Sequence, residues 1–261
     1  VPLITLGVTT NGEENEQDGF EFPWLKLASI TTNTLLFSDV IAKLFYASVV
    51  RENEPGSAHK LKEKYLGLAS KCILANDAQG LVKLAGQAAR EFDGIIHDKD
   101  CPKVGIVGEI FLKFNPFSHQ YLEDKLISRG IEVVPPLISP FFLHEFVNVQ
   151  VQKDLCLKES NVPDFMVKIL YQFIARRQKK MNKACRAFRY FRPFTDIYEE
   201  AKGAKGIVSL AAQFGEGWLL PADIAEFVHD GIKNVVSLQP FGCIANHIVS
   251  KGIEKALHRQ Y

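Results

Sequence analysis

The sequence lacks the short motifs that identify many enzymes and metal proteins. It contains no Cys-x-x-Cys pair, Walker loop, GxGxxG fingerprint, HExxH motif or nucleophile motif. Its five cysteines are odd in number and scattered along the chain, namely Cys72, Cys101, Cys156, Cys185 and Cys243. This spacing argues against a disulfide framework, a zinc ribbon and a ferredoxin-type site. A bound metal would need ligands from distant parts of the fold.

A charge excess and a long apolar run are missing as well. With 31 basic and 30 acidic residues the net charge is +1 at pH 7, so nucleic acid or an anionic membrane would need a local patch. No stretch approaches the ~20 uninterrupted apolar residues of a membrane-spanning helix. Val1 to Thr9 is too short and uncharged for a signal peptide. We therefore expect a cytoplasmic protein with no membrane partner.

The 261 residues are enough for one large domain or two modest ones. Hydrophobic residues make up 47% and charged residues 23%, which is typical of a globular protein. The chain begins without Met and ends directly after a predicted helix. These ends indicate a piece of a longer polypeptide.

Residues 1–99 predict a mainly helical region with one strand. Pro2 to Thr9 is typical of a buried strand, and Asn11 to Glu21 of an acidic surface loop. Apolar residues at helical spacing predict three helices, on Leu36, Val40 and Leu44, then Leu61, Tyr65, Leu68 and Cys72, then Leu81, Leu84, Ala88 and Phe92. Asn76 or Asp77 would cap the third helix. Cys72 is expected in the core rather than at a metal site.

Residues 100–261 predict an α/β domain that begins after the polar stretch Asp98 to Lys103. Val104 to Glu109 is a buried strand, Ser118 to Arg129 a helix followed by Gly130, and Ile131 to Val134 a second strand. Strand, helix, strand implies parallel strands with a right-handed crossover. The pattern resumes in a helix that starts near Pro221 and a buried strand from Val235 to Leu238. We expect a flavodoxin-like or Rossmann-like parallel sheet.

A helical insertion at about 140–203 interrupts this pattern. Its long helix carries an apolar side with Phe165, Ile169 and Phe173, and continues into a basic stretch from Arg176 to Arg192 interleaved with aromatic residues. Such a stretch can bind nucleic acid or a phosphate-rich small ligand. A solvated basic face is the commoner outcome in a neutral protein, so nucleic acid is not the expected partner.

Unusual residues follow the predicted strands. Glu109 and Asn115 follow the first strand, and Gln239 to Cys243 follow the last; Gly215-Glu216-Gly217 precedes a helix. In an open parallel sheet the loops at the carboxyl ends of the strands share the edge that binds ligands. We expect Cys243, Glu109, Asn115, Glu216 and His247 to share a crevice there. Each also has a structural interpretation as a turn former, a helix-cap acceptor or a surface residue.

Two chemistries are open at this edge. Glu109 and Glu216 could form a catalytic acid/base pair, although no spacing rule makes that specific. Cys243 precedes a helix that Asn246 would cap, and a helix N-terminus favours thiolate over thiol. The cysteine is therefore either a ligand or redox thiol, or an inert buried residue.

Two stretches carry a family resemblance: Val104 to Phe117, and Gln213 to Leu220 together with Gln239-Pro240-Phe241-Gly242-Cys243-Ile244-Ala245-Asn246-His247. They resemble the C-terminal part of the large 2-hydroxyacyl-CoA dehydratase activase-related proteins of anaerobic bacteria. The resemblance covers the second half well and reaches weakly to Arg51 to Leu66. It implies a relative of the dehydratase component, in which cysteines from separate α/β subdomains hold a four-iron four-sulfur cluster.

In such a protein Cys243 would be a cluster ligand, with Asn115, Gln239, Gly242 and Asn246 as neighbouring cofactor-binding residues. The remaining ligands would come from a longer chain or a homologous subunit, and an acyl-CoA is the implied ligand. An enzymatic role would be that of a lyase or reductase component. The ATP-binding motifs of the activator are absent, so ATP hydrolysis is not expected.

The leading hypothesis is therefore an iron–sulfur redox module. The first alternative is a non-catalytic interaction domain that docks a redox partner through Arg186 or Arg189. The second is a nucleic-acid binder that uses the basic stretch from Arg176 to Arg192.

Overall fold

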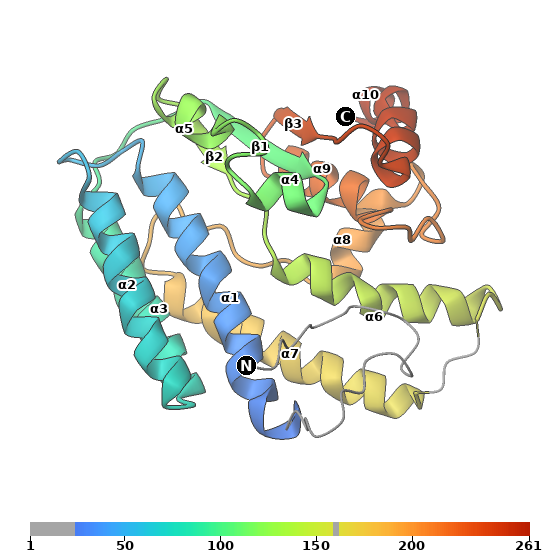
Figure 1. Cartoon of the computed structure of the whole chain (residues 1–261), viewed down its shortest axis with the longest axis horizontal. Coiled ribbons are helices and arrows are strands. Elements are labelled where there is room, and N and C mark those ends of the chain that lie inside the picture. Colours follow the sequence, from blue (N-terminus) through green and yellow to red (C-terminus); the bar gives the residue numbers. More distant parts are fainter. Residues whose placement is uncertain (1–23, 159–161) are drawn as a thin grey trace, which may run out of the picture.

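The computed structural model describes residues 24–158 and 162–261. The predicted strand at Pro2 to Thr9 and the acidic loop at Asn11 to Glu21 lie outside these ranges. The described chain combines a layer of long helices with a three-stranded parallel sheet (Figure 1). No helix within the described ranges is long and apolar enough to cross a membrane.

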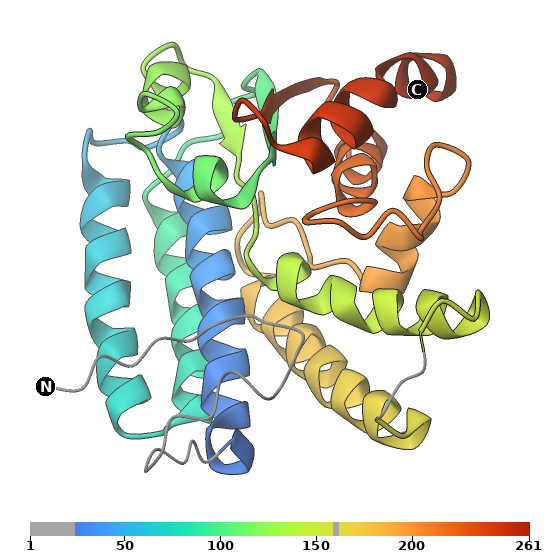
Figure 2. The same cartoon turned by 45° about the vertical axis from the view of Figure 1, so that its right-hand side comes forward.

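The helical layer contains α1 (Trp24–Ser48), α2 (Ser57–Leu74) and α3 (Ala78–Gly94), which run side by side (Figure 2). All three predicted helices are confirmed. The apolar stripe of α1 is buried, with Leu36, Val40 and Leu44 each at most 1% exposed. The Asp77 carboxylate caps α3 by accepting a hydrogen bond from the Gly80 backbone N–H, 2.8 Å away. Cys72 is half-buried and packs against this core.

A fourth helix, α7 (Asp164–Cys185), packs on α1 and α3 and completes the helical core. Its Met181 and Cys185 side chains are fully buried there. Gly86 of α3 permits the close approach, because a Cβ at that position would lie 3.2 Å from the Ala184 carbonyl oxygen. The predicted insertion thus contributes to the core of the first hundred residues. The division of the chain into two domains stays a prediction.

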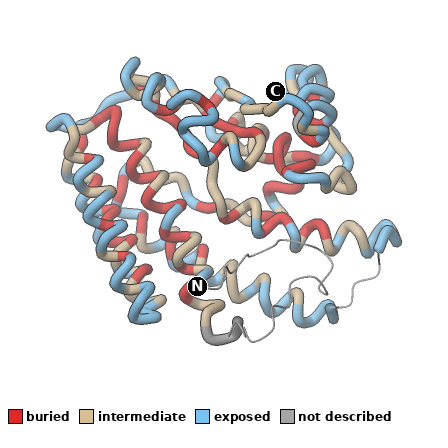
Figure 3. Tube along the Cα trace, viewed as in Figure 1, coloured by how far each residue is buried: buried red, intermediate tan, exposed pale blue. Residues whose placement is uncertain are grey.

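The sheet contains β1 (Lys103–Gly108), β2 (Glu132–Val134) and β3 (Asn234–Leu238) in the order β2-β1-β3. Both neighbours pair with β1 in parallel, which confirms the predicted parallel α/β arrangement. The prediction of a buried last strand is wrong. β3 is half-exposed because it lies at an edge of the sheet and pairs with β1 on one side (Figure 3).

The remaining helices of the described ranges are α4 (Ile110–Phe114), α5 (Leu122–Ile127), α6 (Ser139–Asp154), α8 (Ile197–Ala204), α9 (Leu219–His229), the π-helix η1 (Ala245–Ser250) and α10 (Glu254–Gln260). Of these, α4, α5 and α9 pack against the strands of the sheet. Trp218 is fully buried between α6 and α8, and its indole N–H donates to the Asn148 side-chain oxygen at 2.8 Å. Phe227 of α9 packs against Val107 and Val134 of the sheet.

Two predicted helices need correction. The helix expected from Ser118 to Arg129 starts only at Leu122, because Gln120 and Tyr121 adopt left-handed backbone conformations that a helix cannot contain. The helix expected to start at Asn246 is replaced by η1 and the separate helix α10. The apolar stretch of residues 206–212 forms neither helix nor strand.

A buried ion pair joins the helical layer to the sheet. The guanidinium of Arg51, just after α1, donates to the Glu132 carboxylate of β2 at 2.6 Å, with both side chains almost fully buried. The same guanidinium donates to the carbonyl oxygens of Ala47 and Lys99 and lies 4.1 Å from the centre of the Tyr190 ring. Because its donors are well satisfied, this charge is tolerated in the interior.

Substituting Glu132→Gln should therefore lower the free energy of unfolding by about 3 kcal/mol, because it leaves the Arg51 charge buried without its counter-ion. The matched control is Glu199→Gln, which breaks an exposed pair with Lys202 and should cost less than about 0.5 kcal/mol. Urea unfolding of both variants measures the difference. Equal costs would show that the buried pair does not hold the two layers together.

Candidate functional site at the carboxyl edge of the sheet

The carboxyl ends of the three strands meet at one edge, as predicted. Gly108, the last residue of β1, is held against Leu238, the last residue of β3, and the Glu109 N–H donates to the Leu238 carbonyl oxygen at 3.0 Å. Gly108 has a φ of 127°, and a Cβ there would lie 2.1 Å from that oxygen. Glycine is thus required for the loops after β1 and β3 to lie side by side.

The two predicted acid/base carboxylates do come together at this edge. Glu109 is the N-cap of α4, and its carboxylate accepts from the Leu112 N–H at 3.0 Å. Glu216 reaches α4 from the glycine-rich loop and accepts from the Ile110 N–H at 2.7 Å. Both carboxylates satisfy backbone donors at the start of a helix, which is the structural role foreseen for them. Their catalytic role stays a prediction.

The predicted cofactor-binding residues have local partners. The Asn115 side chain accepts from the Phe117 N–H at 3.1 Å and forms the turn after α4. Gln239 donates to the Ser250 hydroxyl at 2.6 Å and ties the end of β3 to η1. Gly242 has a φ of 84° and donates its N–H to the His247 imidazole at 3.2 Å. Asn246 lies in η1, and its side chain is outside the described part of the structure.

Cys243 is half-buried in the loop between β3 and η1, at the predicted edge. The glycine-rich loop lies against this region, since a Cβ at Gly215 would be 3.5 Å from that of Ala245. The exposed side chains of Phe241 and Ile244 flank the cysteine in sequence. The loops that carry Cys243 and Glu216 are therefore neighbours, and His247 lies in the adjoining η1. The crevice that these residues were expected to share stays a prediction.

The other cysteines lie in different parts of the fold. Cys101 is buried before the amino end of β1, which is the opposite end of the sheet. Cys185 is buried in the helical core, where burial raises the pKa of its thiol to about 12. Cys156 is exposed after α6, and Cys72 lies in α2. Within residues 24–158 and 162–261, no three His, Cys, Asp or Glu side chains are grouped so that they could hold a metal ion.

The basic stretch is divided between the core and the surface. Among its aromatic residues, Phe188 and Phe194 are buried in the helical core, so they are not exposed stacking platforms. Arg189 pairs with Asp93 through two hydrogen bonds of 3.0 Å. Arg186 is exposed. Nucleic-acid binding through the basic stretch and docking of a redox partner through Arg186 or Arg189 both stay predictions.

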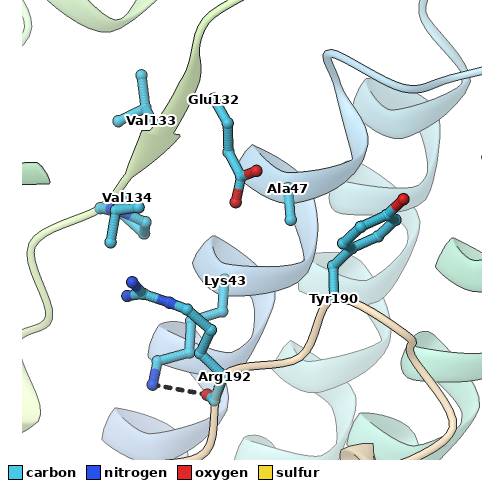
Figure 4. Close-up of a pocket in the computed structure, with 8 residues that line it drawn as sticks. Lys43, Ala47, Glu132, Val133, Val134, Tyr190 and Arg192 are labelled. Carbon is cyan, nitrogen blue, oxygen red and sulfur yellow. Dashed lines mark hydrogen bonds between the residues drawn. The ribbon is translucent and has the colours of Figure 1, made fainter. Parts of the chain in front are cut away.

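A polar cleft that the sequence did not reveal lies beside the carboxyl end of β2. It consists of two small cavities, of about 10 and 20 Å³, that share Lys43, Pro135 and Arg192. In Figure 4 the side chains of Lys43 and Arg192 lie next to each other, while Glu132 projects from β2 toward α1. The larger cavity continues to Lys113 of α4 and to Asp223, Glu226 and Asp230 at α9.

Lys43 is the buried centre of this cleft. Its ammonium donates to the carbonyl oxygens of Arg192 and Pro193, at 3.0 and 3.3 Å, and lies 4.3 Å from the centre of the Phe194 ring. Burial and the nearby Arg192 charge lower its pKa to about 8, although Glu226 acts in the opposite direction. Lys43 thus links α1 to the segment after α7.

Asp223 faces the same cleft from α9. Burial raises the pKa of its carboxyl to about 7, with Glu226 and Glu216 adding to the rise and Lys113 opposing it. The effect of Glu216 connects the cleft electrostatically to the predicted acid/base pair. A carboxyl of this pKa can hold or release a proton at neutral pH.

Sequence reasoning missed Lys43, Lys113 and Asp223. The available signal was a charged residue among apolar neighbours: Lys43 lies between Ile41 and Leu44 on α1, and Lys113 lies between Leu112 and Phe114. A charge in such a position is costly to bury and is often kept for a specific contact.

Comparison of the chain with protein families, with curated proteins and with solved structures finds no match.

The substitution Gly108→Ala should destabilise the protein by roughly 3 kcal/mol or more, because its methyl group would overlap the Leu238 backbone and separate β3 from β1. Gly242→Ala is the matched control. It also has a positive φ, but its Cβ would meet nothing within 4 Å, so it should cost about 1 kcal/mol. Thermal and urea unfolding compare the two, and similar costs would contradict the close packing of the strand ends.

The pH dependence of stability tests Asp223. Its folded pKa of about 7 exceeds the ordinary 3.8, so between these values the folded state binds more protons than the unfolded state, and stability falls as pH rises. Asp223→Asn removes this loss. The unfolding free energy of the variant, relative to the wild type, should rise by roughly 2 kcal/mol from pH 5 to pH 8. The exposed Asp100→Asn control should show no such trend, and a flat difference for Asp223→Asn would refute the assignment.

Proposed function

We propose that this chain is a module of a cytoplasmic redox protein related to the 2-hydroxyacyl-CoA dehydratases. In this proposal Cys243 supplies one thiolate to an iron–sulfur cluster, and an acyl-CoA is the ligand of the complete protein. The observation that supports it is the position of Cys243, half-buried beyond β3 at the ligand-binding edge of a parallel sheet. The resemblance of Gln239 to His247 to that family points to the same residue.

The finer fold assignment, flavodoxin-like or Rossmann-like, belongs to the same proposal. It is supported by the order β2-β1-β3, in which the first strand is central and all strands are parallel. That order is the beginning of the flavodoxin-like arrangement.

The described residues do not fit a complete cluster site. A four-iron cluster needs about four thiolates around one point, whereas Cys101 and Cys185 are buried elsewhere and no metal-holding group occurs in the described ranges. The buried Cys185 thiol, with its raised pKa, is also a poor ligand because the thiolate is the form that binds metals. The proposal therefore assigns one ligand to this chain and the others to a homologous subunit or a longer form.

Anaerobic reconstitution with iron and sulfide tests the assignment of Cys243. Reconstituted together with the homologous subunit or as the longer form that supplies the other ligands, the wild type should acquire iron, sulfide and broad visible absorbance, and Cys243→Ser should weaken all three. Cys156→Ser is the matched control, because Cys156 is exposed and lies away from the sheet edge. A colourless wild type, or equal iron content in the wild type and Cys243→Ser, would refute the proposed cluster for this chain.

A further inference from the structure

Exposed apolar side chains gather where the strands of the sheet end. Five of them, which we call the edge patch, are two-thirds or more exposed: Phe111, Phe214, Phe241, Ile244 and Ile248. Phe241 is fully exposed and Phe214 is 84% exposed. Leaving large apolar side chains in water is unfavourable, and burying them is the main gain when two proteins associate.

The edge patch comes from three segments that touch one another. The Ile110 N–H of α4 donates to a carboxylate of the glycine-rich loop at 2.7 Å. A Cβ at Gly215 of that loop would lie 3.5 Å from the Cβ of Ala245 in η1. The Phe241 ring lies 6.4 Å from the His247 ring, which places the loop after β3 beside η1. The fold thus brings residues from distant parts of the sequence to one edge of the sheet.

Exposed charges are scarce in these segments. Residues 239–248 contain no Asp, Glu, Lys or Arg. Lys113 and Glu216, each two positions from a residue of the edge patch, are buried, and the Glu109 carboxylate is bonded to the first turn of α4. A charged partner would lose hydration against such a surface without gaining an ion pair. A second copy of the same surface meets it without like-charge repulsion.

The edge patch is also large enough for a protein interface. At their exposures the five side chains offer roughly 700 Å² on each copy, whereas the largest apolar patch of a typical monomer is about 300–600 Å². Two copies would bury on the order of 1,400 Å², and specific protein–protein complexes bury about 1,200–2,000 Å². The net charge of +1 gives two copies little electrostatic reason to stay apart.

We propose that the edge patch is the interface of a symmetric dimer of this chain. A surface that is complementary to itself forms an isologous contact, in which the same residues of both copies meet across a two-fold axis. Aromatic side chains are enriched, and charged ones depleted, at the centres of protein interfaces. Because the loop after β3 carries Phe241 and Ile244, the dimer brings the Cys243 loops of both copies into one interface. The proposal rests on the exposed surface and not on an iron–sulfur cluster.

Sedimentation velocity of the full chain over a series of protein concentrations, in reducing buffer without iron, is the direct test. We expect the wild type to change from monomer to dimer as the concentration rises. Phe241→Asp and Phe214→Asp place a charge in the interface and should each raise the dissociation constant of the dimer by roughly tenfold or more. A wild type that stays monomeric up to its solubility limit, or a dimer that both variants leave unchanged, would overturn the proposal.

Two controls carry the same substitution at exposed apolar residues outside the edge patch. Leu74→Asp changes the end of α2, and Ile169→Asp changes the exposed apolar side of α7. Both should dimerise within about twofold of the wild type, and far-UV circular dichroism checks that all four variants are folded. Loss of the dimer in Ile169→Asp but not in Phe241→Asp would place the interface on α7 and refute the edge patch. A monomeric wild type that binds phosphatidylcholine vesicles through Phe241 would assign the patch to a membrane instead.

Discussion

The structure depends on one buried polar side of α1. Along this helix and just beyond it, Asp39, Lys43 and Arg51 are all buried, and each bonds to a segment from the other half of the chain. The Asp39 carboxylate accepts the backbone N–H groups of Ile138 and Ser139, both at 2.9 Å, and Lys43 and Arg51 bond to the segments described above. Burying these groups is costly, so the helical layer and the sheet are stable only in the one arrangement that satisfies them all. Apolar packing alone would tolerate many arrangements.

This requirement also explains why polar chemistry gathers on one side of the sheet. α1 runs past β2, so its buried lysine opens onto the loop that follows β2, while the loops after β1 and β3 carry the two carboxylates and the cysteine. The helix α4 connects the two regions. Glu109 and Glu216 hold its first turn, and Lys113 on its last turn reaches the cleft. One short helix thus joins the loops at the strand ends to the cleft, so a shift of α4 would alter both regions.

The sequence predicted the parts of the fold that follow from local periodicity. Residue spacing predicted the apolar stripes of α1, α2 and α3 and the cap at Asp77. The order of strand, helix and strand predicted the parallel pairing of β1 and β2. Sequence reasoning failed where a residue's environment is set by distant segments. The half-exposed β3 has the same apolar sequence as a buried strand, and Tyr121 gives no local warning of its left-handed conformation. The pairing of Arg51 with Glu132 could not be predicted either, because the two residues are 81 positions apart and no sequence pattern links them.

The two margins of the sheet are not equivalent. β2 has α1 beside it, anchored through Glu132, whereas β3 is half-exposed and, within the described residues, pairs with β1 alone. A free strand edge is a template for a further strand. The sheet can therefore be enlarged on one side only, since growth beyond β2 would require the removal of α1. A further strand paired with β3 would place the Cys243 loop between the loops of two neighbouring strands, whereas it now lies at the edge of the sheet.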